Sequence, residues 1–201
     1  MKTFLLIGAM LALSSLTAFA GTVTYSTSTS QLCVGANGCG VSTQTIGGSV
    51  LVTFNPIASS SVFADPTTFS SFGEIVIACV GGGTACSSQS LAGLNLFLNI
   101  AQTFPSNGSA SISGGVITGS ISGVGSSAVI TWSVPNAVSI GTVSYSLINN
   151  PLGLVPPSVF GGTTFIQGVI TDSPVPEPST YALISSALLG LGLLRKRLVR
   201  Q

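Results

Sequence analysis

The 201-residue sequence contains no histidine and has few charged residues of either sign. Lys, Arg, Asp and Glu together make up 4% of the chain, against about 25% in an average soluble protein. No Lys or Arg lies between Lys2 and Arg195, so the interior carries only acidic charges: Asp65, Glu74, Asp172 and Glu177. A body without cations cannot neutralise phosphate groups, and this excludes nucleic-acid binding.

The missing histidine also removes the Ser-His and Cys-His nucleophile systems and the commonest metal ligand. A glycosidase needs two facing carboxylates, and Asp65 and Glu74 each stand beside a Pro or Gly, where acidic residues usually serve turns. No acid-rich loop of the Asp-x-Asp-x-Asp kind is present to bind calcium. The sequence therefore predicts no enzyme activity, no cofactor and no metal; a carboxylate pair or a calcium site built from these acids is the alternative.

Residues 21–172 contain no apolar run near the roughly 18 residues that span a bilayer. Residues 1–20, by contrast, have a basic Lys2, an apolar stretch and the small-residue ending Ala18-Phe19-Ala20. This is the pattern of a secretory signal peptide, and we expect signal peptidase to cleave after Ala20. A retained N-terminal anchor helix is the alternative. No Cys follows the apolar stretch, which argues against a lipoprotein anchor.

Four cysteines are present, and four cysteines allow three pairings. The two local pairs, Cys33–Cys39 and Cys79–Cys86, are favoured because Gly-rich segments between them let the chain turn back. Closing such small loops contributes about 2–2.5 kcal/mol each in the loop-entropy model. A four-Cys zinc site is the alternative, but its usual pairs have two to four residues between ligands, against five and six here. Disulfides indicate an exported protein.

The middle of the chain consists of short, β-rich segments separated by Gly, Pro, Asn and Ser. Apolar residues alternate with Ser and Thr, as in the run Leu94, Leu96, Leu98 and Ile100, which predicts strands with one buried face. We expect one all-β domain, a β-sandwich of jelly-roll type. A β-solenoid is the alternative, but no fixed repeat period runs through the chain. The expected bulky core residues are Phe54, Phe97, Trp132 and Phe165.

The C-terminus begins with a Pro-rich linker and continues with a short apolar helix, Tyr181–Leu194, and a basic end, Arg195-Lys196-Arg197. Fourteen helical residues reach about 21 Å, less than the ~30 Å hydrocarbon core of a bilayer. The basic cluster nevertheless favours membrane insertion with this end on the cytoplasmic side. The expected organisation is a signal peptide at 1–20, a sandwich domain at 21–172, a linker at 173–180, and an apolar helix with a basic tail at 181–201.

The order of these C-terminal elements resembles the PEP-CTERM sorting domain. The resemblance covers Val175–Gln201 and includes the Pro176-Glu177-Pro178 triplet, the apolar helix and the basic tail. One small departure is Tyr181, where the family often has Trp. The resemblance implies that an exosortase, a transpeptidase of Gram-negative bacteria that make exopolysaccharide, recognises Pro176, Glu177 and Pro178 and removes the tail after transient inner-membrane insertion.

Two non-enzymatic functions are compatible with the body. The first is a structural component of the cell surface or of a biofilm matrix, associated with exopolysaccharide. The second is a carbohydrate-binding module, for which Trp132, Tyr25 and Tyr145 are the aromatic candidates. Each of the three lies in an alternating strand pattern, where burial is the more frequent outcome. The structural function is therefore preferred.

Overall fold

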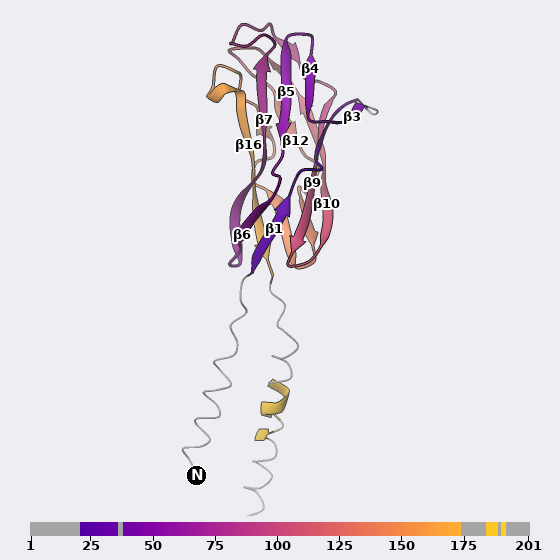
Figure 1. Ribbon diagram of the computed structural model, residues 1–201, viewed down its shortest axis with the longest axis vertical. Helices are drawn as coiled ribbons and strands as arrows, with labels where there is room; N and C mark the ends of the chain where they lie inside the picture. The colour runs from indigo at the N-terminus through magenta and orange to yellow at the C-terminus, as the bar shows by residue number, and fades with distance from the viewer. Residues whose placement is uncertain (1–20, 36–37, 174–183, 189, 192–201) are drawn as a thin grey trace, which may run out of the picture. The chain divides into compact units, whose positions relative to one another are not determined.

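The computed structural model describes residues 21–35, 38–173, 184–188 and 190–191 (Figure 1). Ala20–Ser173 form one compact unit, here called the body, in which nearly all regular structure is β-strand. Every pairing between its strands is antiparallel. Such pairing suits a chain of short strands joined by tight turns.

Two main sheets make up the body. The first contains, in spatial order, β15 (Leu152–Gly153), β12 (Val129–Thr131), β10 (Gly108–Thr118), β9 (Leu94–Phe104), β1 (Thr22–Ser26) and β6 (Ser60–Phe63). Two further strands belong to this sheet: β2 (Gln31–Val34) pairs with β9, and β3 (Gly38–Val41) pairs with β2. The second contains β13 (Ala137–Ile140), β14 (Val143–Leu147), β16 (Thr163–Asp172), β7 (Thr67–Cys79), β5 (Val50–Asn55) and β4 (Thr43–Ile46). A small additional sheet pairs β8 (Gln89–Ser90) with β11 (Ser120–Ile121), and the 3-10 turn η1 covers Phe160–Gly162. The chain passes repeatedly from one main sheet to the other, and the predicted all-β sandwich is confirmed.

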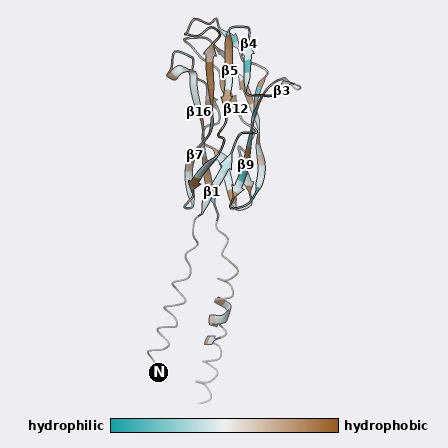
Figure 2. Ribbon diagram, in the orientation of Figure 1, coloured by the Kyte–Doolittle hydropathy of each residue, from teal (hydrophilic) through white to brown (hydrophobic). Residues whose placement is uncertain are grey.

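Alternating burial along the strands builds the core. Val50, Val52 and Phe54 of β5 are fully buried, while the residues between them are partly exposed. In Figure 2 apolar residues colour much of β5 and β7, and hydrophilic residues appear along β9. The inward-facing residues of both sheets join in one continuous hydrophobic cluster, which is how a sandwich removes its apolar surface from water.

Three aromatic rings pack against one another between the two sheets. Tyr25 comes from the first sheet, and Phe72 and Tyr145 come from the second. Their ring centroids lie 5.8, 5.9 and 6.1 Å apart in edge-on arrangements. Each such pair adds about 0.5–1.5 kcal/mol beyond the burial of its surface. All three side chains have at most 1% of their surface exposed.

Two of the four predicted core aromatics lie on the surface instead. Phe54 and Trp132 are buried as expected, but Phe97 is 41% exposed and Phe165 is 55% exposed. The reason is the phase of the alternation. Phe97 lies between the buried Leu96 and Leu98 and therefore faces outward, since successive side chains of a strand point to opposite faces.

Candidate functional site

Most of the predicted sorting residues lie outside the described part of the chain. This applies to Pro176, Glu177 and Pro178, to the basic cluster Arg195, Lys196 and Arg197, and to the signal cleavage residue Ala20. Within the expected apolar segment, residues 184–188 and 190–191 are helical. No described helix has the length and apolar character needed to cross a membrane.

All four cysteines are described, and all four are paired. Cys33 is bonded to Cys39 with a Cα–Cα distance of 4.1 Å, and Cys79 is bonded to Cys86 with a Cα–Cα distance of 5.3 Å. These are the two local pairs that the Gly-rich spacing favours. With every cysteine sulfur in a disulfide, no thiolate is left to bind zinc or to act as a nucleophile.

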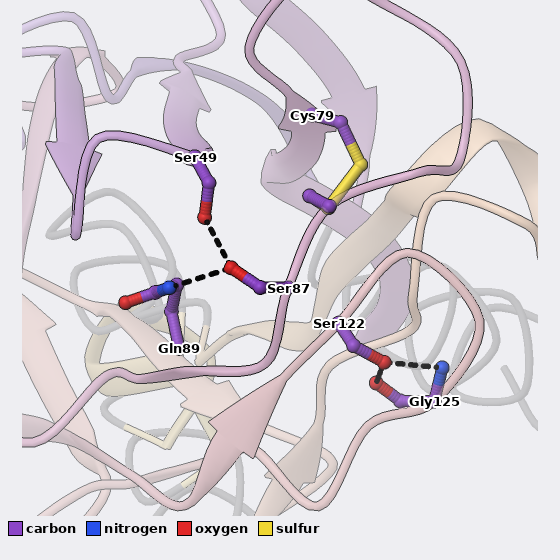
Figure 3. Close-up of a disulfide and its surroundings, with 7 residues drawn as sticks. Ser49, Cys79, Ser87, Gln89, Ser122 and Gly125 are labelled. Carbon is purple, nitrogen blue, oxygen red and sulfur yellow. Dashed lines mark hydrogen bonds between the residues drawn. A yellow bond between two sulfur atoms is a disulfide. The ribbon is translucent and has the colours of Figure 1, made fainter.

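The Cys79–Cys86 disulfide closes a loop at the end of β7, and short polar side chains tie the neighbouring loops together (Figure 3). The Ser87 hydroxyl lies 3.2 Å from that of Ser49 and accepts a hydrogen bond from Gln89 Nε2 at 3.0 Å. Ser122 Oγ donates to the Gly125 carbonyl at 3.2 Å and accepts from the Gly125 N–H at 3.1 Å. Backbone bonds from Gly123 N to Cys86 O and from Ser158 N to Gly123 O connect three loops. We call residues 80–88, 122–125 and 156–162 the tip.

Glu74 and Asp172 lie too far apart to form a catalytic pair of carboxylates. Glu74 accepts a hydrogen bond from Asn55 at 2.9 Å and lies opposite Phe165, seven positions along β16 from Asp172. That separation corresponds to about 23 Å along a strand, and a glycosidase needs its carboxylates about 5–9.5 Å apart. Among the described residues, no group of three or more potential metal ligands occurs.

Asp172 lies at the other end of the body from the tip and is 5% exposed. Its Oδ1 accepts a hydrogen bond from Thr142 Oγ1 at 2.9 Å, and its N–H donates to the Pro66 carbonyl at 2.8 Å. No Lys or Arg occurs between Lys2 and Arg195, so no side chain of the body balances this carboxylate. A carboxylate this deeply buried usually has a cationic partner.

The three aromatic candidates for sugar binding are all buried. Tyr25 donates its hydroxyl to the Ser71 carbonyl at 2.6 Å, and Tyr145 donates to Gln102 Oε1 at 2.6 Å, with Gln102 itself 2% exposed. Burial raises the pKa of both tyrosines above its ordinary value. Trp132 is 2% exposed, and its indole Nε1 is a buried donor for which the described residues provide no acceptor. None of these rings can stack on a ligand from solution.

An aromatic side chain with polar neighbours does occur on the outer face of the first sheet, centred on Phe97. Asn95 and Asn99 lie two positions before and after it on β9, and all three side chains point to the same face. Gln31 of β2 lies directly opposite Phe97. We call Phe97, Asn95, Asn99 and Gln31 the Phe97 face. The period-two pattern of the leucines on β9 is the signal in the sequence that places Phe97 outward.

The strand β10 that pairs with β9 is irregular beside Phe97. The register of β10 shifts between Ile112 and Gly115, and this bulge places Ser113 and Gly114 beside Phe97. Gly114 has φ = 75°, a conformation that favours glycine, and a Cβ at this position would meet Ser133. Asn99 is held in place, since its Nδ2 donates to the Thr29 carbonyl at 2.9 Å and its Oδ1 accepts from the Ser111 hydroxyl.

Comparison with known proteins places the sorting segment in a family. The model of the PEP-CTERM protein-sorting motif matches residues 174–197. No curated protein and no solved structure matches the chain. The resemblance seen in the Pro-Glu-Pro triplet, the apolar segment and the basic tail is thus confirmed, and the motif implies an exported protein that an exosortase sorts to the cell envelope or surface.

Proposed function

We propose that this PEP-CTERM protein is a structural component of the cell surface or of the extracellular matrix, without enzymatic activity. In this proposal exosortase recognises Pro176, Glu177 and Pro178, the segment 181–201 is held transiently in the inner membrane, and the body is then transferred or released outside. The match of the sorting motif to residues 174–197 is the observation that carries the proposal. The resemblance to exosortase substrates supplies the link to exopolysaccharide.

The construction of the body supports a durable, chemically inert module. Its two disulfides close local loops, its strands form one continuous core, and its outer surface is dominated by Ser and Thr instead of charges. It has no Lys or Arg, so trypsin-like proteases, whose specificity pocket requires a cationic side chain, have no site in it. A matrix protein exposed to secreted proteases benefits from these properties.

The strand directions predict how the attached body is oriented. Ser173, where the sorting segment follows, lies at the Asp172 end of β16, and the tip lies at the Cys79 end of β7. The thirteen residues of β7 extend about 43 Å at 3.3 Å per residue. A body attached through its C-terminal side therefore presents the tip, with the exposed Val124 and Phe160, farthest from the attachment point.

The proposal is tested by replacing the Pro176-Glu177-Pro178 triplet with three alanines in a host that has an exosortase. The variant chain should keep its C-terminus through Gln201 and disappear from the surface and matrix fractions, which are measured by fractionation and mass spectrometry. The matched control is Glu74→Ala, which removes one carboxylate from the body and should leave sorting unchanged. A matrix of unchanged cohesion in a strain without the protein would contradict the structural function.

A second candidate function, binding of a neutral glycan, is favoured by the Phe97 face. Sugar rings stack their apolar C–H faces on aromatic rings, and amide side chains both donate and accept hydrogen bonds. Phe97 is 41% exposed, and amides flank it on its own strand and on β2. The face has no charged residue, so the glycan would be uncharged at this position.

The glycan proposal is tested with the host's exopolysaccharide and a glycan array. Phe97→Ala should weaken binding about tenfold or more, equivalent to about 1.4 kcal/mol. Phe165→Ala is the matched control, because it removes an exposed phenyl ring from the other sheet. Binding that Phe97→Ala leaves unchanged, or the absence of binding to any glycan, would refute this second function.

A further inference from the structure

The carboxylate of Asp172 is buried at the point where the first and last strands of the body meet. Asp172 ends β16 in the second sheet, and Gly21 precedes β1 in the first sheet. A Cβ built on Gly21 would lie 3.4 Å from Oδ2 of Asp172. The Gly21 nitrogen is about 2.5 Å from that Cβ position by covalent geometry, so it lies within about 6 Å of the carboxylate oxygen.

Gly21 is held in this place by the turn between β6 and β7. Its carbonyl accepts a hydrogen bond from the Ala64 N–H at 3.2 Å, and two residues later the Pro66 carbonyl accepts the N–H of Asp172 at 2.8 Å. One turn thus fixes the backbone of both residues. The hydrogen bond is made by the Gly21 carbonyl and does not use the Gly21 nitrogen.

Cleavage after Ala20 changes the charge of this nitrogen. Hydrolysis of the Ala20–Gly21 peptide bond adds the hydroxyl of water to the Ala20 carbonyl carbon and leaves Gly21 with an amine, which takes up a proton at neutral pH. The processed body would then contain one cation, because residues 21–173 contain no Lys, Arg or His. The ordinary α-amino pKa of about 7.7–8.0 keeps this group charged at neutral pH.

We propose that the α-ammonium group of Gly21, created by signal cleavage, binds the Asp172 carboxylate and thereby joins the first strand of the body to the last. This inference rests on the proposed export and cleavage after Ala20. Before cleavage Gly21 has a neutral amide, so the ion pair forms only in the processed protein. The buried carboxylate that the side chains of the body leave without a cation receives one from the chain's own new terminus.

The other ionisable groups around this site favour the pair or do not interfere with it. Asp65 lies in the same turn, between Ala64 and Pro66, and adds a second negative charge that favours an ammonium. Tyr145 of β14 and Tyr25 of β1 have pKa values raised by burial, and the charge of Asp172 raises that of Tyr145 further. Both tyrosines are therefore neutral in the pH range where an α-amine titrates.

The pair is tested by measuring the pKa of the α-amine in the processed protein, purified from the exporting host and dimethylated with ¹³C-formaldehyde for NMR. Because the body has no Lys, the label reports the terminus, with Lys196 as the one other amine beyond residue 20. The pKa should be about one unit above that of a similarly labelled peptide with the same N-terminal residues. Asp172→Asn should return it to the peptide value, and Glu74→Gln, which removes a distant carboxylate, should leave it raised.

A second variant covers the case in which Asp172→Asn does not fold. Inserting Gly-Ser between Ala20 and Gly21 moves the new ammonium away from the carboxylate and leaves every residue of the body intact, and its α-amine should titrate at the peptide value. A peptide-like pKa in a protein whose first residue is Gly21, or a raised pKa in both variants, would overturn the ion pair. A mature chain that begins at another residue would also overturn it, and the mass of the N-terminal peptide separates that result from failure of the pair itself.

Discussion

At the scale of single residues, the protein depends on buried polar groups that are satisfied by hydrogen bonds. Tyr145 and Gln102 bridge the two sheets through a 2.6 Å bond inside the core. Gln102 completes its bonding by donating to the carbonyl and hydroxyl of Ser106 at 3.0 and 2.9 Å. The removal of one member of such a network costs more than the bond itself, since the partner is left buried and unpaired.

Tyr145→Phe tests this network. The substitution keeps the ring contacts with Tyr25 and Phe72 but leaves Gln102 Oε1 without its donor, and we expect the free energy of unfolding to fall by about 1–3 kcal/mol. Thr118→Val, which removes an exposed hydroxyl from β10, should change it by no more than about 0.5 kcal/mol. Urea unfolding of both variants gives the comparison. If the free energy of unfolding of Tyr145→Phe equals that of the unsubstituted protein, the buried hydrogen bond contributes nothing to stability.

The proposed terminal ion pair makes a prediction about pH at the same scale. If the α-amine pKa is raised in the folded state, the stabilisation is fully present below the unfolded value of about 7.7–8.0 and is lost as the pH rises through the folded value. A shift of one unit corresponds to about 1.4 kcal/mol. Urea unfolding at pH 7 and pH 9, below the range in which the unfolded tyrosines titrate, should therefore show a loss of about 1 kcal/mol, which Asp172→Asn should remove. An equal loss in Asp172→Asn would assign the pH dependence to another group.

At the scale of elements, a disulfide between Cys79 and Cys86 closes one loop of the tip. Replacing both cysteines by serine reopens a loop of eight residues, and the loop-entropy model predicts a loss of about 2.5 kcal/mol. For a body of this size that corresponds to a fall in Tm of roughly 5–10 °C. Ser87→Ala, which breaks the hydrogen bonds with Ser49 and Gln89 but keeps the disulfide, should have a much smaller effect in the same thermal scan. A double variant with an unchanged Tm would contradict the assigned contribution.

Much of the sheet structure follows from local sequence. The alternation in Val50–Asn55 and Leu94–Phe104 predicts these strands because one face is apolar and the other polar. The local disulfides follow from spacing and glycine content. The apolar-rich segment from Val138 to Ile148 forms not one strand but the hairpin of β13 and β14, and Gly141 with φ = 61° provides its turn.

Other features depend on tertiary contacts and could not be predicted from the sequence. β4 and β6 are rich in Thr and Ser and lack a clear apolar period; they are strands because a neighbouring strand supplies their backbone hydrogen bonds. The approach of Gly21 to Asp172 joins residues far apart in the chain. The outward orientation of Phe97, by contrast, could have been predicted from the sequence, since the alternation of the leucines on β9 determines which way Phe97 points.

At the scale of the whole molecule, the sorting segment determines where the protein goes and the body determines what it does there. The segment matches a known motif, whereas no curated protein or solved structure matches the chain. The body is a disulfide-bonded sandwich without cations, and it starts and ends at neighbouring positions, Gly21 and Asp172.

The most direct test of this account is the intact mass of the mature protein from a host that has an exosortase. We predict a chain that begins at Gly21, contains two disulfides and ends near Pro176-Glu177-Pro178, with the basic residues Arg195, Lys196 and Arg197 removed. Chymotryptic peptides are required to map its ends, because the body offers trypsin no Lys or Arg. A mature chain that still ends at Gln201 in such a host would contradict the central claim that exosortase processes this protein.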